Sequence, residues 1–93
     1  MVTHIVLFRF TESADAEEAR RLLLELAGQI PAMTKLEVGL DFTCSARSFE
    51  LGLITRHESR AALDAYQVHP EHVRVATFIR SKMAGSAAVD FEE

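Results

Sequence analysis

The first ten residues carry apolar side chains on both faces of an extended chain. Val6, Phe8 and Phe10 alternate with Ile5 and Leu7 in the run THIVLFRF. A short run rich in β-branched and aromatic residues predicts a strand. Because both of its faces are apolar, we expect this strand to be covered on both sides, as it would be in the centre of a sheet.

Residues 11–31 change to the spacing of an amphipathic helix. The apolar residues recur at i, i+3 and i+4 and form one stripe, made of Ala19, Leu22, Leu23, Leu26, Ala27 and Ile30. Ser13 or Asp15 is expected to cap the N-terminus, and acidic side chains fill the first turn. Pro31 prevents the helix from continuing, so the segment predicts one helix that buries a single face.

Two alternating segments, 33–42 and 49–57, predict two further strands. The apolar faces are formed by Leu36, Val38 and Leu40 in the first and by Phe49, Leu51, Leu53 and Thr55 in the second. The polar connection 43–48 indicates a hairpin between them. The first of the two has a wetter opposite face, which favours a place at the edge of the sheet.

A sharp junction at His69 and Pro70 separates two predicted helices, over 60–66 and 70–83. Ser59 can cap the first helix. Pro70 restricts the residue before it to an extended conformation and suits the first position of a helix. The inward stripe of the second helix is expected to be His72 or Val73, followed by Ala76, Ile79 and Met83.

Residues 86–93 read as a short strand and complete the order strand, helix, strand, strand, helix pair, strand. This order predicts an α+β, ferredoxin-like βαββαβ fold as a single domain over residues 1–93. Right-handed crossovers give a four-stranded antiparallel sheet in the order 4-1-3-2. Helices cover only one face of such a sheet, so we expect a homodimer, formed by sheet-to-sheet packing, to cover the apolar residues of the other.

Composition and charge limit the kinds of partner that the protein is expected to bind. Ten basic and fourteen acidic side chains give a net charge of -4, and the basic residues are scattered. This distribution argues against nucleic-acid binding, and no apolar run approaches the roughly 20 residues of a membrane span. Residues 1–10 lack the basic start of a signal peptide. One cysteine, Cys44, fits a reducing compartment, so we expect a cytoplasmic protein without a membrane partner.

The stretch AYQVHPEHVR, residues 65–74, carries the candidate chemistry. In a helix that begins at Pro70, His72 lies in the first turn, where the helix dipole favours a neutral imidazole. A neutral imidazole can act as a general base, and Tyr66 could supply a phenolic donor to an oxyanion. The alternative is structural, because a tyrosine at a helix end is often a core-edge residue and a histidine beside a proline is often a cap.

A metal site is a weaker interpretation of the same stretch. His69 and His72 are three residues apart, and His4 is the one distant candidate for a third ligand. A capping role for His69 would turn its side chain away, so we predict no metal. His57 is interpreted as a solvated residue at a strand end. Phosphate-binding, nucleophile-elbow and zinc-protease motifs are absent from the sequence.

Four segments together resemble the stress-responsive dimeric α/β-barrel family, called the Dabb domain. They are HIVLFRF, IPAM, ESRAALDAYQVHPEHV and VDFEE, and the resemblance extends over nearly the whole chain. It implies a ferredoxin-like subunit whose sheet packs against the sheet of a partner to form a barrel. Most members of the family have no assigned reaction, so the expected function is that of a homodimer that binds a small apolar or aromatic ligand.

The resemblance also implies an enzymatic alternative, a polyketide cyclase or isomerase that needs no cofactor. A plant cyclase of the family has the pattern Tyr, two residues, His-Pro, one residue, His, which falls on Tyr66, His69, Pro70 and His72. By this similarity His72 removes an acidic proton and Tyr66 holds the carbonyl oxygen. Other pocket positions of the cyclase correspond to Leu23, Leu51 and Met83, which keep the cavity apolar. The expected ligand contacts are His4, Phe8, Leu51, Leu53, His69, Ile79 and Met83.

Overall fold

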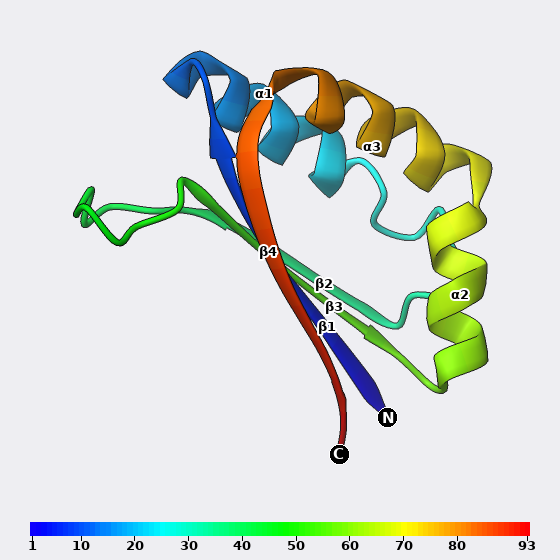
Figure 1. Ribbon diagram of the computed structural model, residues 1–93. Helices are drawn as coiled ribbons and strands as arrows, with labels where there is room; N and C mark the ends of the chain where they lie inside the picture. The colour runs from blue at the N-terminus through cyan, green and yellow to red at the C-terminus, as the bar shows by residue number, and fades with distance from the viewer.

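A four-stranded antiparallel sheet carries all three helices on one of its faces (Figure 1). The structure, a computed structural model, describes residues 1–93. The strands are β1 (Val2–Phe10), β2 (Lys35–Leu40), β3 (Leu51–His57) and β4 (Met83–Glu92), and the helices are α1 (Ser13–Leu24), α2 (Arg60–Val68) and α3 (Pro70–Lys82). The strand order β2-β3-β1-β4 confirms the predicted ferredoxin-like arrangement.

The register of the central strand decides which side chains face the helices. Val6 of β1 lies opposite Leu53 of β3 and Ala88 of β4. Directly opposed residues share a face, and faces alternate along a strand. The even-numbered residues of β1 therefore point towards the helices, and Ile5 and Leu7 point to the other side. The predicted place of this strand in the centre of the sheet is confirmed.

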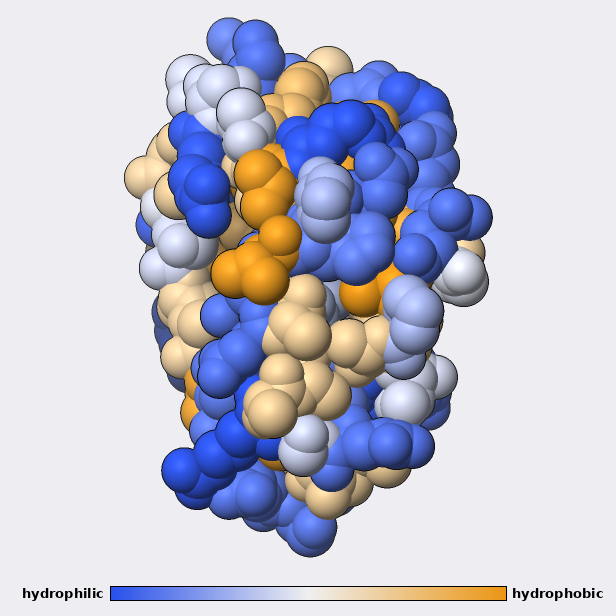
Figure 2. Space-filling model, turned by 90° about the vertical axis from the view of Figure 1, so that its right-hand side faces the viewer, coloured by the Kyte–Doolittle hydropathy of each residue, from blue (hydrophilic) through white to orange (hydrophobic).

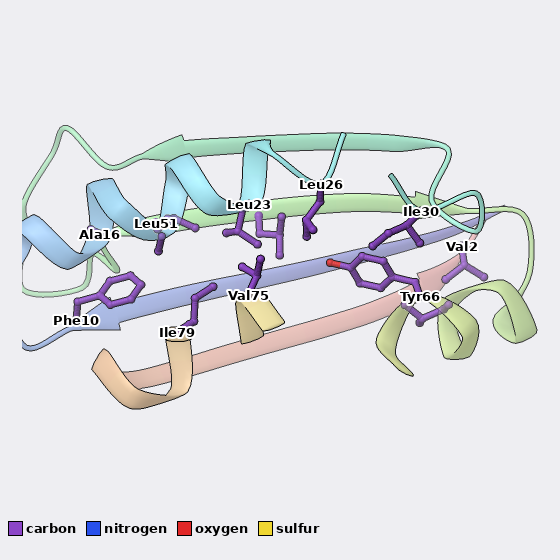
Figure 3. Close-up of a cluster of buried hydrophobic side chains, with 13 residues drawn as sticks. Val2, Phe10, Ala16, Leu23, Leu26, Ile30, Leu51, Tyr66, Val75 and Ile79 are labelled. Carbon is purple, nitrogen blue, oxygen red and sulfur yellow. The ribbon is translucent and has the colours of Figure 1, made fainter. Parts of the chain in front are cut away.

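The hydrophobic core lies between the three helices and one face of the sheet (Figure 3). Its buried members come from every helix and from β1 and β3: Val2, Phe10, Ala16, Ala19, Leu23, Leu26, Ile30, Leu51, Leu53, Leu63, Tyr66, Val75 and Ile79. Tyr66 is fully buried among these residues, and Figure 3 shows its ring extending from α2 into the core.

The first helix differs from the prediction at both ends. Its N-cap is Glu12, which makes no capping hydrogen bond with its side chain, so the expected caps Ser13 and Asp15 are wrong. The helix ends at Leu24, and a chain of turns follows in which Gly28 adopts a positive φ of 75°. These turns carry Leu26 and Ile30 into the core, while Ala27, predicted to lie on the buried stripe, is exposed.

The α2–α3 junction forms as predicted. Ser59 caps α2 by accepting a hydrogen bond of 3.1 Å from the backbone N–H of Ala62, and α3 begins at Pro70. The inward face of α3 contains Val75, which is buried, whereas Val73 is 45% exposed. Of the two expected starting points of the stripe, His72 is therefore the correct one. The last strand is longer than predicted, because it begins directly after α3 at Met83.

The face of the sheet opposite the helices remains open. Ile5 lies opposite Ile54 and Val89 there, and Leu7 extends the same face. Val89 is 53% exposed and Leu7 is 37% exposed. Figure 2 views a different side of the molecule, that of α2, where hydrophilic side chains surround smaller hydrophobic patches. None of the helices has the length and apolar composition that a membrane span requires.

Candidate functional site

The bend between α2 and α3 positions the candidate residues. His69 is extended, with φ -62° and ψ 135°, and its Nδ1 accepts a hydrogen bond of 3.1 Å from the backbone N–H of Glu71. Pro70 supplies the first residue of α3 and needs no hydrogen-bond partner for its nitrogen. A second bond closes the bend, because Nδ1 of His72 donates to the carbonyl oxygen of Gln67 at 3.0 Å.

The bend brings Tyr66 and His72 into contact. Their ring centroids are 4.4 Å apart, and their planes meet at 51°. The hydroxyl group of Tyr66 is buried and has no hydrogen-bond partner. Burial raises the pKa of this phenol to about 12. Tyr66 is therefore protonated at neutral pH and holds an unused O–H donor inside the protein.

The imidazole of His72 is held in its neutral form. Partial burial lowers its pKa below the ordinary value and is the largest effect, while the bond to the Gln67 carbonyl acts in the opposite direction. The charges of His4 and Arg80 lower the pKa further. A carbonyl oxygen can only accept, so the proton of the neutral ring is on Nδ1 and the lone pair is on Nε2.

A second histidine, His4, lies near the start of β1 and close to Tyr66. It is 7% exposed, and its ring centroid is 6.2 Å from that of Tyr66. Nδ1 of His4 contacts the carboxylate of Asp90, which lies directly opposite on β4. This contact fixes the orientation of the ring. Asp90 could not be recognised as a site residue from the sequence, because only the register of β1 against β4 places it beside His4.

His57 is buried, so its interpretation as a solvated strand-end residue is wrong. Its exposed fraction is 0%. Nδ1 donates to the carbonyl oxygen of Ala32 at 2.7 Å, and Nε2 is 2.9 Å from the hydroxyl group of Thr55. The ring also packs on Tyr66 at a centroid distance of 4.9 Å. Burial lowers the pKa of His57, which is consistent with a structural, neutral imidazole beneath the site.

A cavity of about 330 Å³ lies between α3 and the sheet beside this cluster. Six of the residues that the sequence singled out line it, namely His4, Phe8, Leu53, His72, Ile79 and Met83. Leu51 and His69 lie outside the lining, in the core and at the α3 cap respectively. Tyr66 lies behind His72 and also outside the lining.

The remaining lining residues are Val6, Leu23, Gln67, Ala76, Arg80 and Ser86. Periodicity already placed Val6, Leu23 and Ala76 on inward faces, and the family resemblance also placed Leu23 in the pocket. Ser86 could not be recognised in the same way, since its position depends on the pairing of β4 with β1. The side chains of His, Cys, Asp and Glu form no group of three that could hold a metal ion. The nitrogen His69 would offer as a ligand already accepts the capping bond.

The chain matches one protein-family model over nearly its whole length. The family model described as Stress responsive A/B Barrel Domain, Dabb, matches residues 2–93. The chain belongs to the Dabb family. The resemblance seen in the sequence is thereby confirmed for the Dabb domain as a whole. No curated protein sequence matches the chain.

Solved structures place this Dabb domain among ferredoxin-like proteins. A dimeric protein of unknown function from Bacteroides fragilis NCTC 9343 superposes with a TM-score of 0.87 at 25% identity, covering 99% of this chain and 95% of that one. A dimeric ferredoxin-like protein of unknown function from Jannaschia sp. CCS1 gives 0.82 at 28% identity, with 99% and 98% covered. Hydroxynitrile lyase from Passiflora edulis gives 0.82 at 16% identity, with 97% and 90% covered, and shares the fold alone.

Proposed function

We propose that this Dabb domain is a homodimeric cytoplasmic protein that binds a small apolar or aromatic molecule in the cavity between α3 and the sheet. The observation that carries the proposal is the lining of this cavity. Seven of its twelve lining residues are apolar, and the polar groups include the two imidazoles of His4 and His72. Such a combination of an apolar wall with a few polar groups is typical of small-molecule sites.

The homodimer is supported by the open face of the sheet. Ile5, Leu7, Ile54 and Val89 form an apolar surface that the helices of the same chain do not cover. Related structures from Bacteroides fragilis and Jannaschia are described as dimeric. Packing of two such faces would remove apolar area from water and supply the second side of the core. The unpaired, exposed Cys44 is compatible with a reducing cytoplasm.

A second candidate function is a polyketide cyclase or isomerase that needs no cofactor. The unpartnered hydroxyl group of Tyr66 next to the neutral imidazole of His72 favours it. Nε2 of His72 would take a proton from the carbon next to a carbonyl group. The electron pair of the broken C–H bond would form an enolate. Because Tyr66 lies outside the cavity lining, its hydroxyl group would donate to the enolate oxygen only after a shift of the His72 ring.

Binding can be tested by NMR with the full chain. A panel of small phenols and aromatic ketones would be titrated into protein with labelled histidines, and we expect saturable shifts at His4 and His72. His57 is closed off by two hydrogen bonds and serves as an internal control. A panel that perturbs no histidine, or only surface sites far from the cavity, would contradict the binding proposal.

The enzymatic candidate has its own experiment, which needs no knowledge of the natural substrate. Phenylacetone in D₂O would report proton abstraction through exchange of the hydrogens next to its carbonyl group. We expect exchange catalysed by the wild type and lost in His72→Ala, with the variant still folded by circular dichroism. Binding without exchange would leave the first function in place and exclude this one for ketones of this size.

A further inference from the structure

We propose that the ligand of the cavity is a carboxylic acid with an elongated apolar or aromatic body, whose carboxylate is bound by Arg80. The inference rests on the proposed binding function and adds the chemical class of the ligand. It also assigns the carboxylate of the ligand to Arg80 and the body of the ligand to the apolar side chains of the cavity.

Arg80 is the one residue with a permanent charge among the twelve that line the cavity. No aspartate or glutamate belongs to the lining, and Arg80 makes no ion pair or side-chain hydrogen bond. Arg74 on the same helix differs, because it lies 3.6 Å from Glu71 and 3.9 Å from Glu25. Arginine presents a planar set of donors that fits a carboxylate in two-point contact. Arg80 is exposed at the cavity, and an unpaired guanidinium in a lining without a carboxylate favours an anionic ligand.

Arg80 and His72 occupy different turns of α3. Arg80 follows His72 by eight positions, which corresponds to about 12 Å between their backbone positions along the helix axis. Phe8, opposite Ser86, lies four residues beyond His4 along β1, or about 13 Å away. The apolar side chains of the lining include Val6, Leu53, Ala76 and Ile79.

Stabilisation of α3 by the charge of Arg80 does not explain why Arg80 lines the cavity. Both Arg80 and Lys82 are in the last turn of α3, where a positive charge interacts favourably with the helix dipole. Lys82 does this from outside the cavity, since only Arg80 belongs to the lining. The dipole accounts for positive charge in this turn but not for its direction towards the cavity. Lys82 is therefore the matched control for a loss of charge.

A pair of probes that differ only in charge tests the proposal. Binding of 4-phenylbutyrate and of its neutral amide would be measured by calorimetry at low ionic strength with the full chain. We expect the wild type to prefer the carboxylate by about fivefold, the scale of one partly solvated ion pair. Arg80→Gln should abolish this preference by weakening carboxylate binding about fivefold relative to amide binding. Arg80→Lys should retain part of it, and Lys82→Gln should retain all of it.

The outcomes separate this inference from the function on which it depends. Equal binding of the two probes by the wild type, or an unchanged preference in Arg80→Gln, overturns the assignment of the carboxylate and leaves the binding function intact. Binding of neither probe, together with no response in the wider neutral panel, removes the binding function and the inference with it. An equal loss of preference in Lys82→Gln would show that the charge acts through the helix rather than in the cavity.

Discussion

The phenol ring of Tyr66 lies against the imidazole of His72, with 4.4 Å between their centroids, although the two residues belong to different helices. The hydroxyl group of Tyr66 is buried without a partner, and an unsatisfied buried polar group costs about 1–3 kcal/mol of stability. A protein that keeps such a group next to a neutral imidazole retains a donor that its own fold does not use.

Replacing this hydroxyl group should separate function from stability. In Tyr66→Phe we expect the free energy of unfolding in urea to rise by about 1 kcal/mol, because the unpaired O–H is removed and the ring remains. Where the wild type catalyses deuterium exchange next to the carbonyl group of phenylacetone, the variant should catalyse it more slowly. As a control, Tyr66→Ala should lose about 3–5 kcal/mol by leaving a cavity in the core. A clear loss of stability in the phenylalanine variant would mean that the hydroxyl group is bonded in solution.

The two histidines of the junction should respond differently to substitution. His72→Ala removes a residue of the cavity wall, so we expect ligand binding to weaken by about tenfold, equivalent to roughly 1.4 kcal/mol, with a small change in melting temperature. His69→Ala removes the N-cap of α3 and should lower stability by about 1 kcal/mol with binding preserved. A large drop in melting temperature with unaltered binding in His72→Ala would support a purely structural role.

The lowered pKa values of His57 and His72 predict acid sensitivity. Burial is the main cause in both, and the unfolded value is 6.5. Below that pH the unfolded chain binds more protons than the folded one, so the free energy of unfolding should fall as the pH decreases from 6.5 and be constant above it. Urea unfolding from pH 8 to pH 5 measures this change. In the double variant His57→Gln/His72→Gln the free energy of unfolding should change less with pH. A wild-type free energy of unfolding that does not change between pH 8 and pH 5 would contradict the lowered pKa values.

The open face of the sheet predicts the oligomeric state. In Ile54→Asp a charge enters the centre of the apolar surface that also contains Ile5 and Val89, and we expect a dimer to become a monomer in gel filtration. The matched control is Val68→Asp on α2, where the side chain is already 75% exposed and lies on the helical side. A monomeric wild type, or equal dissociation in both variants, would reject sheet-to-sheet packing.

The order of elements and the sheet topology could be predicted because each segment carries one regular apolar pattern. Alternation placed Leu51 and Leu53 on one face of β3, and both are buried. Pro70 marked the junction of two helices without any tertiary information, since its ring restricts the preceding residue and suits the first helical position. These signals are local, and local signals are what a single sequence contains most clearly.

The parts of the site that were missed depend on contacts between distant segments. His57 is buried because the carbonyl oxygen of Ala32, 25 residues away, comes to its ring. Asp90 reaches His4 only through the register of two strands separated by most of the chain. On α3 the start of the inward stripe was left open between His72 and Val73, because both residues are spaced to share a face with Ala76 and only packing selects one.

The bend between α2 and α3 has a consequence for how such a site can diverge. Its two closing bonds, from His72 to Gln67 and from Glu71 to His69, lie within a few residues of each other, as does Tyr66. The spacing of phenol and imidazole is therefore inherited with one short peptide, independently of the sheet. Lineages that keep this peptide can exchange the rest of the cavity wall, supplied by the sheet, α1 and the remainder of α3, and so acquire new ligands while Tyr66 and His72 stay the same.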